Sequence, residues 1–341
     1  QLQQHISAPL PYAELVQLWR TYSVDEEHSS DSTAMLSGEQ LWQQLSEREL
    51  SAIFDYLEVP QFTADNRYRL TEQVSIPQHN NDASLHLYQQ FVQMAAKHTD
   101  STSNEKPTIL VLTAAANDPF ASVDFYLDIF NQLGAASSWL PLSAAYQSAR
   151  QQADCKKLPQ LIAEKQQRYR RDSIYPDRFN ALQQLCEQGP KKAIQAITQA
   201  DAIYIADGDP ALLSAALKLA DGTDSPELAA IRAAVNSKSV LLAAAGNSAA
   251  ALSGTLMTDS TINIPVISNG DSYHALQYGS KAATAPRLGC KKEQACPQGL
   301  SERQLTYLDS AGLGFFSFGI VDTYMAERGR QGRLLVLQQE Q

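Results

Sequence analysis

The chain has 341 residues, of which 44% are hydrophobic, and its formal net charge is −10. This hydrophobic content supports a packed core and excludes wholesale disorder, while the length fits one large α/β domain or two smaller units. The acidic balance argues against nucleic acid as the main partner, because phosphate binding requires a basic face. No apolar run approaches the roughly 20 residues of a membrane-spanning helix. An anion site in this protein must therefore be a local basic cluster.

Residues 1–106 are predicted to form a polar, mainly helical N-terminal extension. Gln, Ser, Asp and His are abundant there, and two stretches, Gly38–Leu57 and Ala83–Lys97, carry apolar residues at spacings close to the helical period. The apolar residues expected on one side of the second helix are Leu85, Leu87, Phe91 and Met94. The histidines of this extension lack zinc-ligand spacing and are expected on the solvated surface. They are His79, His86 and His98.

From Pro107 the sequence changes to short apolar strands that alternate with helices, which predicts an α/β domain over residues 107–341. The expected strands are Thr108–Ala114, Trp139–Leu142, Ala202–Ala206, the run that ends before Gly246, and Ile264–Ile267. Alternation of this kind predicts a doubly wound, mostly parallel sheet that is covered by helices on both faces. Ligand sites of such sheets lie at the carboxyl ends of the strands.

Two turns at strand carboxyl ends are the first candidates for a site. Asp207–Pro210 follows one strand and Gly246–Ser248 follows another, so both are expected to border the same crevice. Ser248 stands where an apolar run gives way to a run of small residues that can start a helix. A serine on such a strand-to-helix turn has the geometry of a nucleophile elbow. The alternative is that Ser248 only caps the helix.

Three arginines near the C-terminus form the local basic cluster that an anion site would need. Arg328, Arg330 and Arg333 follow a glycine-rich turn and an expected strand around Ile320-Val321. Guanidinium groups bind carboxylates through two parallel hydrogen bonds, so the cluster predicts a carboxylate-binding pocket. A helix or loop with a solvated basic face is the alternative.

The four cysteines favour disulfides over a metal site. No pair has the C-x-x-C spacing of zinc or thioredoxin sites, and the chain order suggests the pairs Cys155–Cys186 and Cys290–Cys296. Two disulfides fit an exported protein, and four free thiols in a cytosolic protein are the alternative. The chain begins with Gln1 and shows no signal peptide, so we expect that a signal peptide has been removed.

Several segments of the α/β domain resemble the cyanophycinase and dipeptidase E family of serine peptidases. Gly246–Ala250 (GNSAA) is similar to the family's GTSAG elbow, and Asp322–Arg333 (DTYMAERGRQGR) is similar to its DxHFxxRGRxGR segment. Asp207–Pro210 (DGDP) stands where the family has Gly-Gly-Asp-Gln. The resemblance covers residues 107–337, and Ala136–Leu142 (ASSWLPL) fits the exported cyanophycinases in particular.

The resemblance implies a three-layer fold similar to class I glutamine amidotransferases. It also implies hydrolysis of cyanophycin, a polyaspartate that carries arginine on each side chain, to β-aspartyl-arginine. Ser248 takes the nucleophile position, and the backbone N–H groups of Gly208 and Ala249 take the oxyanion positions. The residues implied to bind substrate are Asp209, Arg328, Arg330 and Arg333. No cofactor and no metal ion are expected; the expected partner is a peptide or polyaspartate-type substrate, and a homodimer is left open.

The sequence departs from the family's motifs at the residues that carry the chemistry. Tyr324 occupies the position of the general-base histidine, and a phenol with a pKa of about 10 is a poor proton acceptor at neutral pH. The acidic member of the triad is not found before Gln341. His274 is a candidate for the missing base, and a packed or surface histidine is the alternative. The further departures are Asp207, Pro210, Asn247 and Ala250.

The resemblance to the family and the departures from its motifs lead to two main functional interpretations. The first is a cyanophycinase-like serine peptidase in which hydrolysis is weak or absent because Tyr324 replaces the histidine. The second is a non-catalytic family member that binds a carboxylate-rich peptide or a partner protein through the three arginines. Loss of the base from a triad costs several orders of magnitude in rate, so the departures favour the second interpretation. An acyl-transfer enzyme that uses Tyr324 as an acid is a third.

Overall fold

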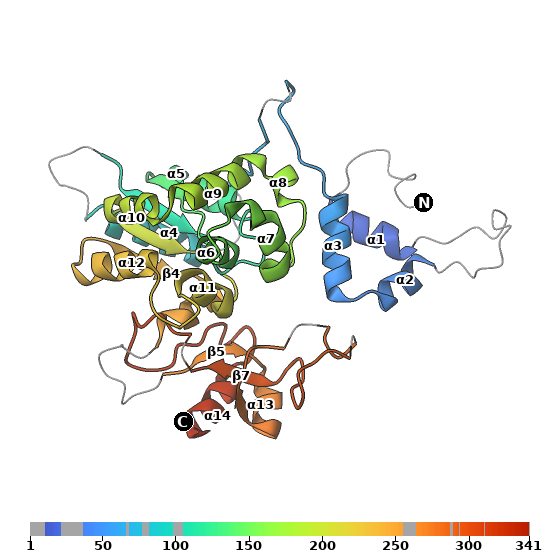
Figure 1. Cartoon of the computed structure of the whole chain (residues 1–341). Coiled ribbons are helices and arrows are strands. Elements are labelled where there is room, and N and C mark those ends of the chain that lie inside the picture. The colour runs from blue at the N-terminus through green and yellow to red at the C-terminus, as the bar shows by residue number, and fades with distance from the viewer. Residues whose placement is uncertain are drawn as a thin grey trace.

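The computed structural model describes residues 11–21, 37–65, 68–76, 82–97, 105–254, 264–286, 289–292, 294–309 and 311–340. Figure 1 shows the arrangement of the chain: α1–α3 stand to one side of a sheet-and-helix body, and β5, β7, α13 and α14 form a C-terminal part next to it. His86 is exposed, as predicted. The predictions for His79 and His98 lie outside the described residues.

In its described residues, the N-terminal region contains four helices, and two of them replace the long helix that was predicted. They are α1 (Tyr12–Thr21), α2 (Gly38–Gln44), α3 (Glu47–Leu57) and α4 (Asp82–Ala95). The prediction of one helix over Gly38–Leu57 is wrong, because Ser46 and Glu49 form a capping box that starts a new helix. The Ser46 hydroxyl accepts the N–H of Glu49, and the Glu49 carboxylate accepts the N–H of Ser46.

Helix α4 packs with a face that only partly matches the predicted one: Phe91 is buried and Leu85 half-buried. Its buried residues are Phe91, Val92 and Ala95, which lie against the sheet, whereas Leu87 and Met94 are exposed. The face is set by the aromatic residues of the sheet and of its neighbouring helix, since the rings of Phe91 and Tyr204 lie 5.6 Å apart between centroids. Part of the region before residue 107 therefore belongs to the layers around the sheet.

A four-stranded parallel sheet in the order β2-β1-β3-β4 forms the centre of the molecule. Its strands are β1 (Thr108–Leu112), β2 (Ala136–Trp139), β3 (Ala202–Ile205) and β4 (Leu241–Ala244). The ends of β1, β3 and β4 are in register at Leu112, Ile205 and Ala244. Strand β2 begins and ends earlier than predicted, because Pro141 has no N–H group with which to continue the ladder.

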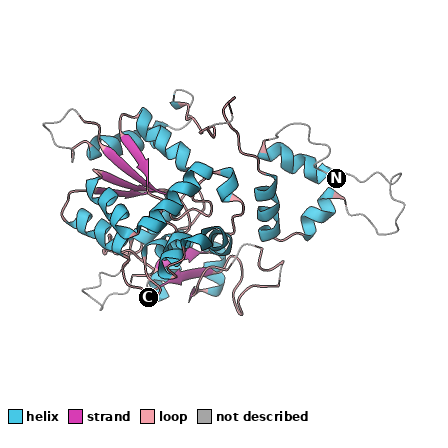
Figure 2. Cartoon of the chain, turned by 45° about the horizontal axis from the view of Figure 1, so that its top comes forward, coloured by secondary structure: helices cyan, strands magenta, loops and turns pink. Residues whose placement is uncertain are grey.

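Helices connect and cover these strands. They are α5 (Val123–Gln132), α6 (Ala144–Gln151), α7 (Leu158–Gln166), α8 (Arg171–Ile174), α9 (Pro176–Gln188), α10 (Pro190–Gln199), α11 (Pro210–Leu217) and α12 (Pro226–Asn236). The 3₁₀ helices η4 (Cys155–Lys157) and η5 (Gly246–Leu252) complete the set for this part of the chain. Figure 2 shows helices around the strands of the larger sheet.

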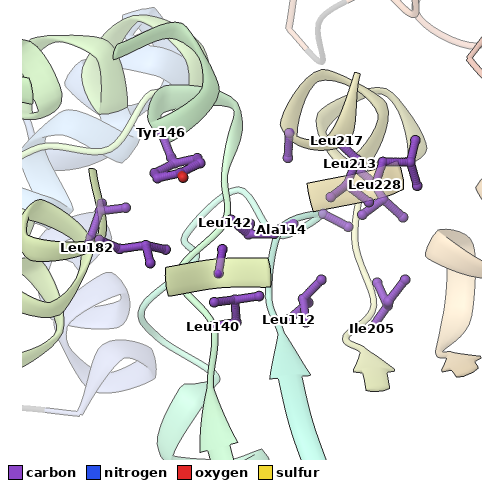
Figure 3. Close-up of a cluster of buried hydrophobic side chains, with 14 of the residues drawn as sticks. Leu112, Ala114, Leu140, Leu142, Tyr146, Leu182, Ile205, Leu213, Leu217 and Leu228 are labelled. Atoms are coloured by element: carbon purple, nitrogen blue, oxygen red, sulfur yellow. The ribbon is translucent and has the colours of Figure 1, made fainter. Parts of the chain in front are cut away.

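Alternate residues of the strands pack into two separate cores, one on each face of the sheet. Leu112 and Ile205 pack with α6, α7 and α9–α12, and Figure 3 shows this core with Leu213 and Leu217 of α11. Tyr204, on the opposite face, packs with α4 and α5. The predicted three-layer α/β fold with a mostly parallel sheet is therefore confirmed.

The C-terminal part has a second sheet in the order β5-β7-β6. Its elements are β5 (Val266–Asn269), α13 (Ser272–Tyr278), β6 (Ser280–Ala282), β7 (Leu305–Leu308) and α14 (Gln331–Glu340). The strand predicted around Ile320-Val321 is wrong: this segment is irregular, and β7 pairs with β5 instead. Arg330 and Arg333 consequently lie at the start of α14 rather than beside a strand end.

Both predicted disulfides are present. Cys155–Cys186 joins η4 to α9, and Cys290–Cys296 closes a short loop in the C-terminal part, so all four cysteines are paired. Two disulfides are compatible with an extracellular or periplasmic location. Among the helices that the structure describes, none has the length and apolar character needed to cross a membrane.

Candidate functional site

The turns that follow β3 and β4 border one hollow of about 370 Å³ at the carboxyl edge of the sheet. This volume lies within the range of about 300–1,000 Å³ that is typical of ligand sites. We call it the arginine hollow, because Arg328, Arg330 and Arg333 line it. The residues contributed by the two turns are Gly208, Asp209, Pro210 and Asn247. The prediction that both turns share one crevice is confirmed.

Ser248 is not among the residues that line this hollow. Its side chain is fully buried within η5, and its hydroxyl donates a hydrogen bond to the backbone carbonyl of Ala206. It makes no helix cap, since Ala245 precedes the first residue of η5. A hydroxyl that is buried and bound to a carbonyl can neither meet a ligand in the hollow nor pass its proton to a base in this conformation.

The two backbone groups proposed for an oxyanion site are not equivalent. Gly208 lines the arginine hollow, whereas Ala249 is not among the residues that line it. A side chain at position 208 is excluded, because a Cβ there would lie 2.1 Å from the carbonyl oxygen of Ala115. The adjacent N–H of Asp209 donates to that same carbonyl at 2.7 Å. The structure thus brings Gly208, but not Ala249, to the hollow.

Asp207 and Tyr324 form a hydrogen-bonded pair beside the hollow. The Tyr324 hydroxyl donates to one oxygen of the Asp207 carboxylate, and the other oxygen accepts the backbone N–H of Asn247 at 2.7 Å. The hydrogen bond to Asp207, together with burial, raises the pKa of Tyr324 above its ordinary value. The phenol therefore stays protonated at neutral pH and acts as a donor. Tyr324 also has a φ of +55°, a strained conformation for a residue with a side chain.

The three arginines differ in how fully their charges are compensated. Arg333 binds the buried carboxylate of Asp322 through two hydrogen bonds, at 2.9 and 2.5 Å. Arg330 lies 3.8 Å from Asp322 and donates to the side-chain oxygen of Asn247 at 2.7 Å. Arg328 is exposed and makes no ion pair with a residue that the structure describes; its guanidinium lies 4.4 Å from the ring centroid of Tyr324.

The titration of Arg330 reflects this incomplete compensation. Burial, followed by the positive charge of Arg333, lowers the pKa of Arg330 to about 10, and the charge of Arg328 acts in the same direction. Asp322 is the acidic side chain that opposes this shift most. A buried guanidinium with too little negative charge around it is a site at which an anion is stabilised.

Asp209 also lines the hollow, and its carboxylate caps a helix. It is the N-cap of α11, and its carboxylate accepts the N–H of Ala211 at 2.8 Å. Pro210 occupies the first position of this helix, where its missing N–H has no cost. Burial raises the pKa of Asp209 above its ordinary value. One of its oxygens is therefore engaged with the helix end, and the carboxylate is poorly solvated.

His274 does not act as a base for Ser248 in this conformation. It lies in α13, where its Nδ1 is 2.9 Å from the carboxylate of Asp271, the residue that caps the helix. It is not among the residues that line the arginine hollow. Within the described residues, the hydrogen bond found for the Ser248 hydroxyl is the one to Ala206, and no imidazole accepts from it.

Several polar residues of the hollow were not singled out from the sequence as site residues. Those that line it include Asn117, Asn269 and Asp322. Asn117 follows β1, so the strand-end argument applied to β3 and β4 would have found it. Asp322 begins the arginine motif, and its pairing with Arg333 needs the turn of chain that only the structure shows.

One cluster in the described residues has the spacing of a metal site, but its chemistry does not fit. It consists of Cys290, Cys296 and Glu302. The two sulfur atoms are joined in a disulfide and offer no thiolate to a cation.

The chemistry available at the arginine hollow is anion binding by guanidinium groups held in fixed positions. Asn247 and Asp322 position Arg330 and Arg333, and Tyr324 lies under Arg328. A comparison of the chain with protein-family models finds no match. An assignment of function therefore depends on the geometry of the arginine hollow and on the sequence motifs whose residues line it.

Proposed function

We propose that the chain is a cyanophycinase-like protein whose arginine hollow binds a carboxylate-rich, polyaspartate-type peptide. We further propose that hydrolysis of cyanophycin at this site is weak or absent. The observation that carries the binding function is the unequal compensation of the three arginines. Asp322 binds Arg333 through two hydrogen bonds, and the pKa of Arg330 is lowered to about 10. Arg328 has no acidic partner among the described residues.

Carboxylates are the ligands that fit this arrangement best. Guanidinium groups donate paired hydrogen bonds to carboxylates, and the surrounding amides of Asn117, Asn247 and Asn269 supply neutral polar contacts. The chain has a net charge of −10, so a positively charged hollow stands out locally against an acidic surface. Repeated aspartates bind such a hollow more tightly than a single acid, because several carboxylates are held on one chain.

The same geometry argues that hydrolysis is weak or absent. The Ser248 hydroxyl is bound to Ala206, and Tyr324 is a protonated donor to Asp207 rather than a base. A serine without a general base loses several orders of magnitude in rate. Turnover would require η5 to release the Ser248 hydroxyl and a base to approach it.

Binding is tested by titrating the whole protein with octa-aspartate and with an uncharged octapeptide, using isothermal calorimetry. We expect binding of the aspartate peptide only, and weakening by about tenfold or more in Arg328→Gln and Arg330→Gln, because each removes a charge-assisted hydrogen-bond donor. Lys191→Gln on the exposed surface of α10 is the matched control for the loss of one charge. Equal affinity of all variants for the peptide would refute the proposal.

Hydrolysis is tested by incubating the protein with cyanophycin and with β-aspartyl-arginine and measuring arginine-containing products. We expect no release above that of the Ser248→Ala variant. Turnover that disappears in Ser248→Ala would instead identify an active peptidase. This outcome is independent of the result of the binding titration.

We also propose that the protein works outside the cytoplasm. The support is the complete pairing of its cysteines in two disulfides. The test is to quantify free thiols in the native protein, isolated both from whole cells and from the periplasmic or extracellular fraction. Free thiols in the native material would contradict it.

A further inference from the structure

A second hollow of about 340 Å³ adjoins the arginine hollow. Asn117 and Asp209 line both, so the two hollows meet at these residues. We call the second one the outer hollow. Its remaining wall comes from α3, from the end of α7 and the turn after it, from α11, and from the loop before the second disulfide. The residues used below are Glu47, Ser51, Lys165 and Gln166.

Helix α3 is fixed against the body by buried charges and is not a loose neighbour. Asp55 of α3 accepts the backbone N–H of Tyr169 at 2.8 Å, and Arg171 donates to Glu58 and to Asp118, both at 2.6 Å. Asp55 and Arg171 are each 3% exposed. Asp118 follows Asn117, which lines both hollows, so this network holds α3 to the turn at which the hollows meet.

Gln166 lines the outer hollow, and its buried side-chain oxygen is an unsatisfied hydrogen-bond acceptor. It is 3% exposed, and its side-chain N–H donates to the carbonyl of Ala116 at 3.3 Å. That bond fixes the orientation of the amide, and the side-chain oxygen has no partner among the described residues. A buried acceptor without a partner is costly, so an N–H donor from a ligand is stabilised there.

Lys165 supplies the complementary donor. Its side chain is exposed at the same hollow, and no hydrogen bond or ion pair joins it to a residue that the structure describes. A peptide main chain carries both an N–H group and a carbonyl at every residue, so it matches an acceptor and a donor that lie along one wall.

We infer that the two hollows form one groove for an extended peptide. Its carboxylates occupy the arginine hollow, and the adjoining main chain lies in the outer hollow against α3. The inference rests on the proposed function for the carboxylate end, but it adds a binding surface that the N-terminal helices supply. The ligand is therefore a chain several residues long, and a free dipeptide fills only part of the site.

Peptide extension at constant charge tests the length of the site. The probes are blocked Asp-Asp, and Asp-Asp extended by six Gly and Ser residues at its N-terminus or at its C-terminus. We expect one extension to tighten binding by about tenfold, the effect of one hydrogen bond to an otherwise unsatisfied buried acceptor. If blocked Asp-Asp binds and neither extension tightens binding, the inference is wrong and the proposed function stands. If octa-aspartate fails to bind, the proposed function is wrong.

Thiol labelling tests where the extension lies. All four native cysteines are in disulfides, so the Ser51→Cys variant has a single reactive thiol. We expect the extended peptide to slow labelling of this thiol in proportion to the bound fraction, and blocked Asp-Asp at equal saturation to leave the rate unchanged. Ala233→Cys, on the exposed face of α12, is the matched control and should label equally fast with either peptide. Labelling of Ser51→Cys that ignores the extended peptide would overturn the inference.

Discussion

The ring of Tyr324 contacts two arginines of the hollow, and its hydroxyl binds Asp207. Two substitutions separate what the ring contributes to peptide binding from what the hydroxyl contributes to stability. The guanidinium groups of Arg328 and Arg330 lie 4.4 and 5.4 Å from the ring centroid. Each such contact contributes about 0.5–1 kcal/mol at a partly exposed site and holds its guanidinium group in place before the peptide binds. In Tyr324→Leu the peptide must fix both groups itself, so binding should weaken by up to about 5- to 30-fold. Tyr324→Phe keeps the ring, and its affinity should stay within about twofold of the wild type.

The hydroxyl acts on stability rather than on binding. Its hydrogen bond to the Asp207 carboxylate contributes about 1.5–3 kcal/mol to the free energy of unfolding, which Tyr324→Phe removes. Because this bond raises the pKa of Tyr324 in the folded state, its contribution is present below the ordinary tyrosine pKa of about 10 and declines as the pH rises above it. The phenylalanine variant should lack that decline.

Calorimetric titration with octa-aspartate and urea unfolding at several pH values measure the two effects on the same preparations. We expect the phenylalanine variant to lose stability but to keep its affinity for the peptide. The leucine variant should lose both. Equal weakening of peptide binding by the two variants would refute the role of the ring. An unchanged stability of Tyr324→Phe would refute the role of the hydroxyl.

The other predictions concern buried charges, the Cys155–Cys186 disulfide and Ser248. Asp322→Asn should lower the free energy of unfolding by about 3–5 kcal/mol in urea unfolding, because Arg333 is left buried without its counter-charge. Burial raises the pKa of Asp209, so its contribution to stability should fall as the pH rises above the ordinary aspartate value. Asp209→Asn, which still caps α11, should remove this slope in unfolding measured between about pH 4 and pH 7. Replacing both Cys155 and Cys186 by Ser opens a link across a sequence separation of 31 and should cost about 3–4 kcal/mol, seen as a lower Tm by circular dichroism. Tyr324→His should not gain cyanophycin hydrolysis, since Ser248 remains bound to Ala206; product release by this variant would show that the missing base alone had disabled the site.

The sheet and its ligand edge could be predicted from the sequence because they depend on local patterns. Short apolar runs such as Ala202–Ala206 have the length of buried strands, and alternation with helices then fixes a parallel arrangement. The meeting of Asp207–Pro210 with Gly246–Ser248 follows from that arrangement alone. The errors lie where long-range contacts decide, as at Ile320-Val321, which has the composition of a strand but no partner, since β7 pairs with β5.

The environment of Ser248 could not be predicted, because it depends on a contact between two turns. The local sequence places the serine after a strand, but the direction of its hydroxyl is set by the carbonyl of Ala206, which lies 42 residues earlier. The anchoring of α3 is hidden for the same reason, since Asp55 and Arg171 come from segments that no local pattern connects.

Asp207, Asn247 and Tyr324 form one hydrogen-bonded unit beside the arginine hollow. Asp207 accepts from both of the others, and the Asn247 side chain in turn accepts from Arg330. Gly246 belongs to the same unit, because a Cβ there would lie 2.1 Å from Cγ of Asp207. A glycine at position 207 would leave the Tyr324 hydroxyl and the backbone N–H of Asn247 without their acceptor. Asp207 thus fixes Tyr324 beneath Arg328, while Asn247 fixes Arg330, so the two contacts together set the positions of two of the three arginines.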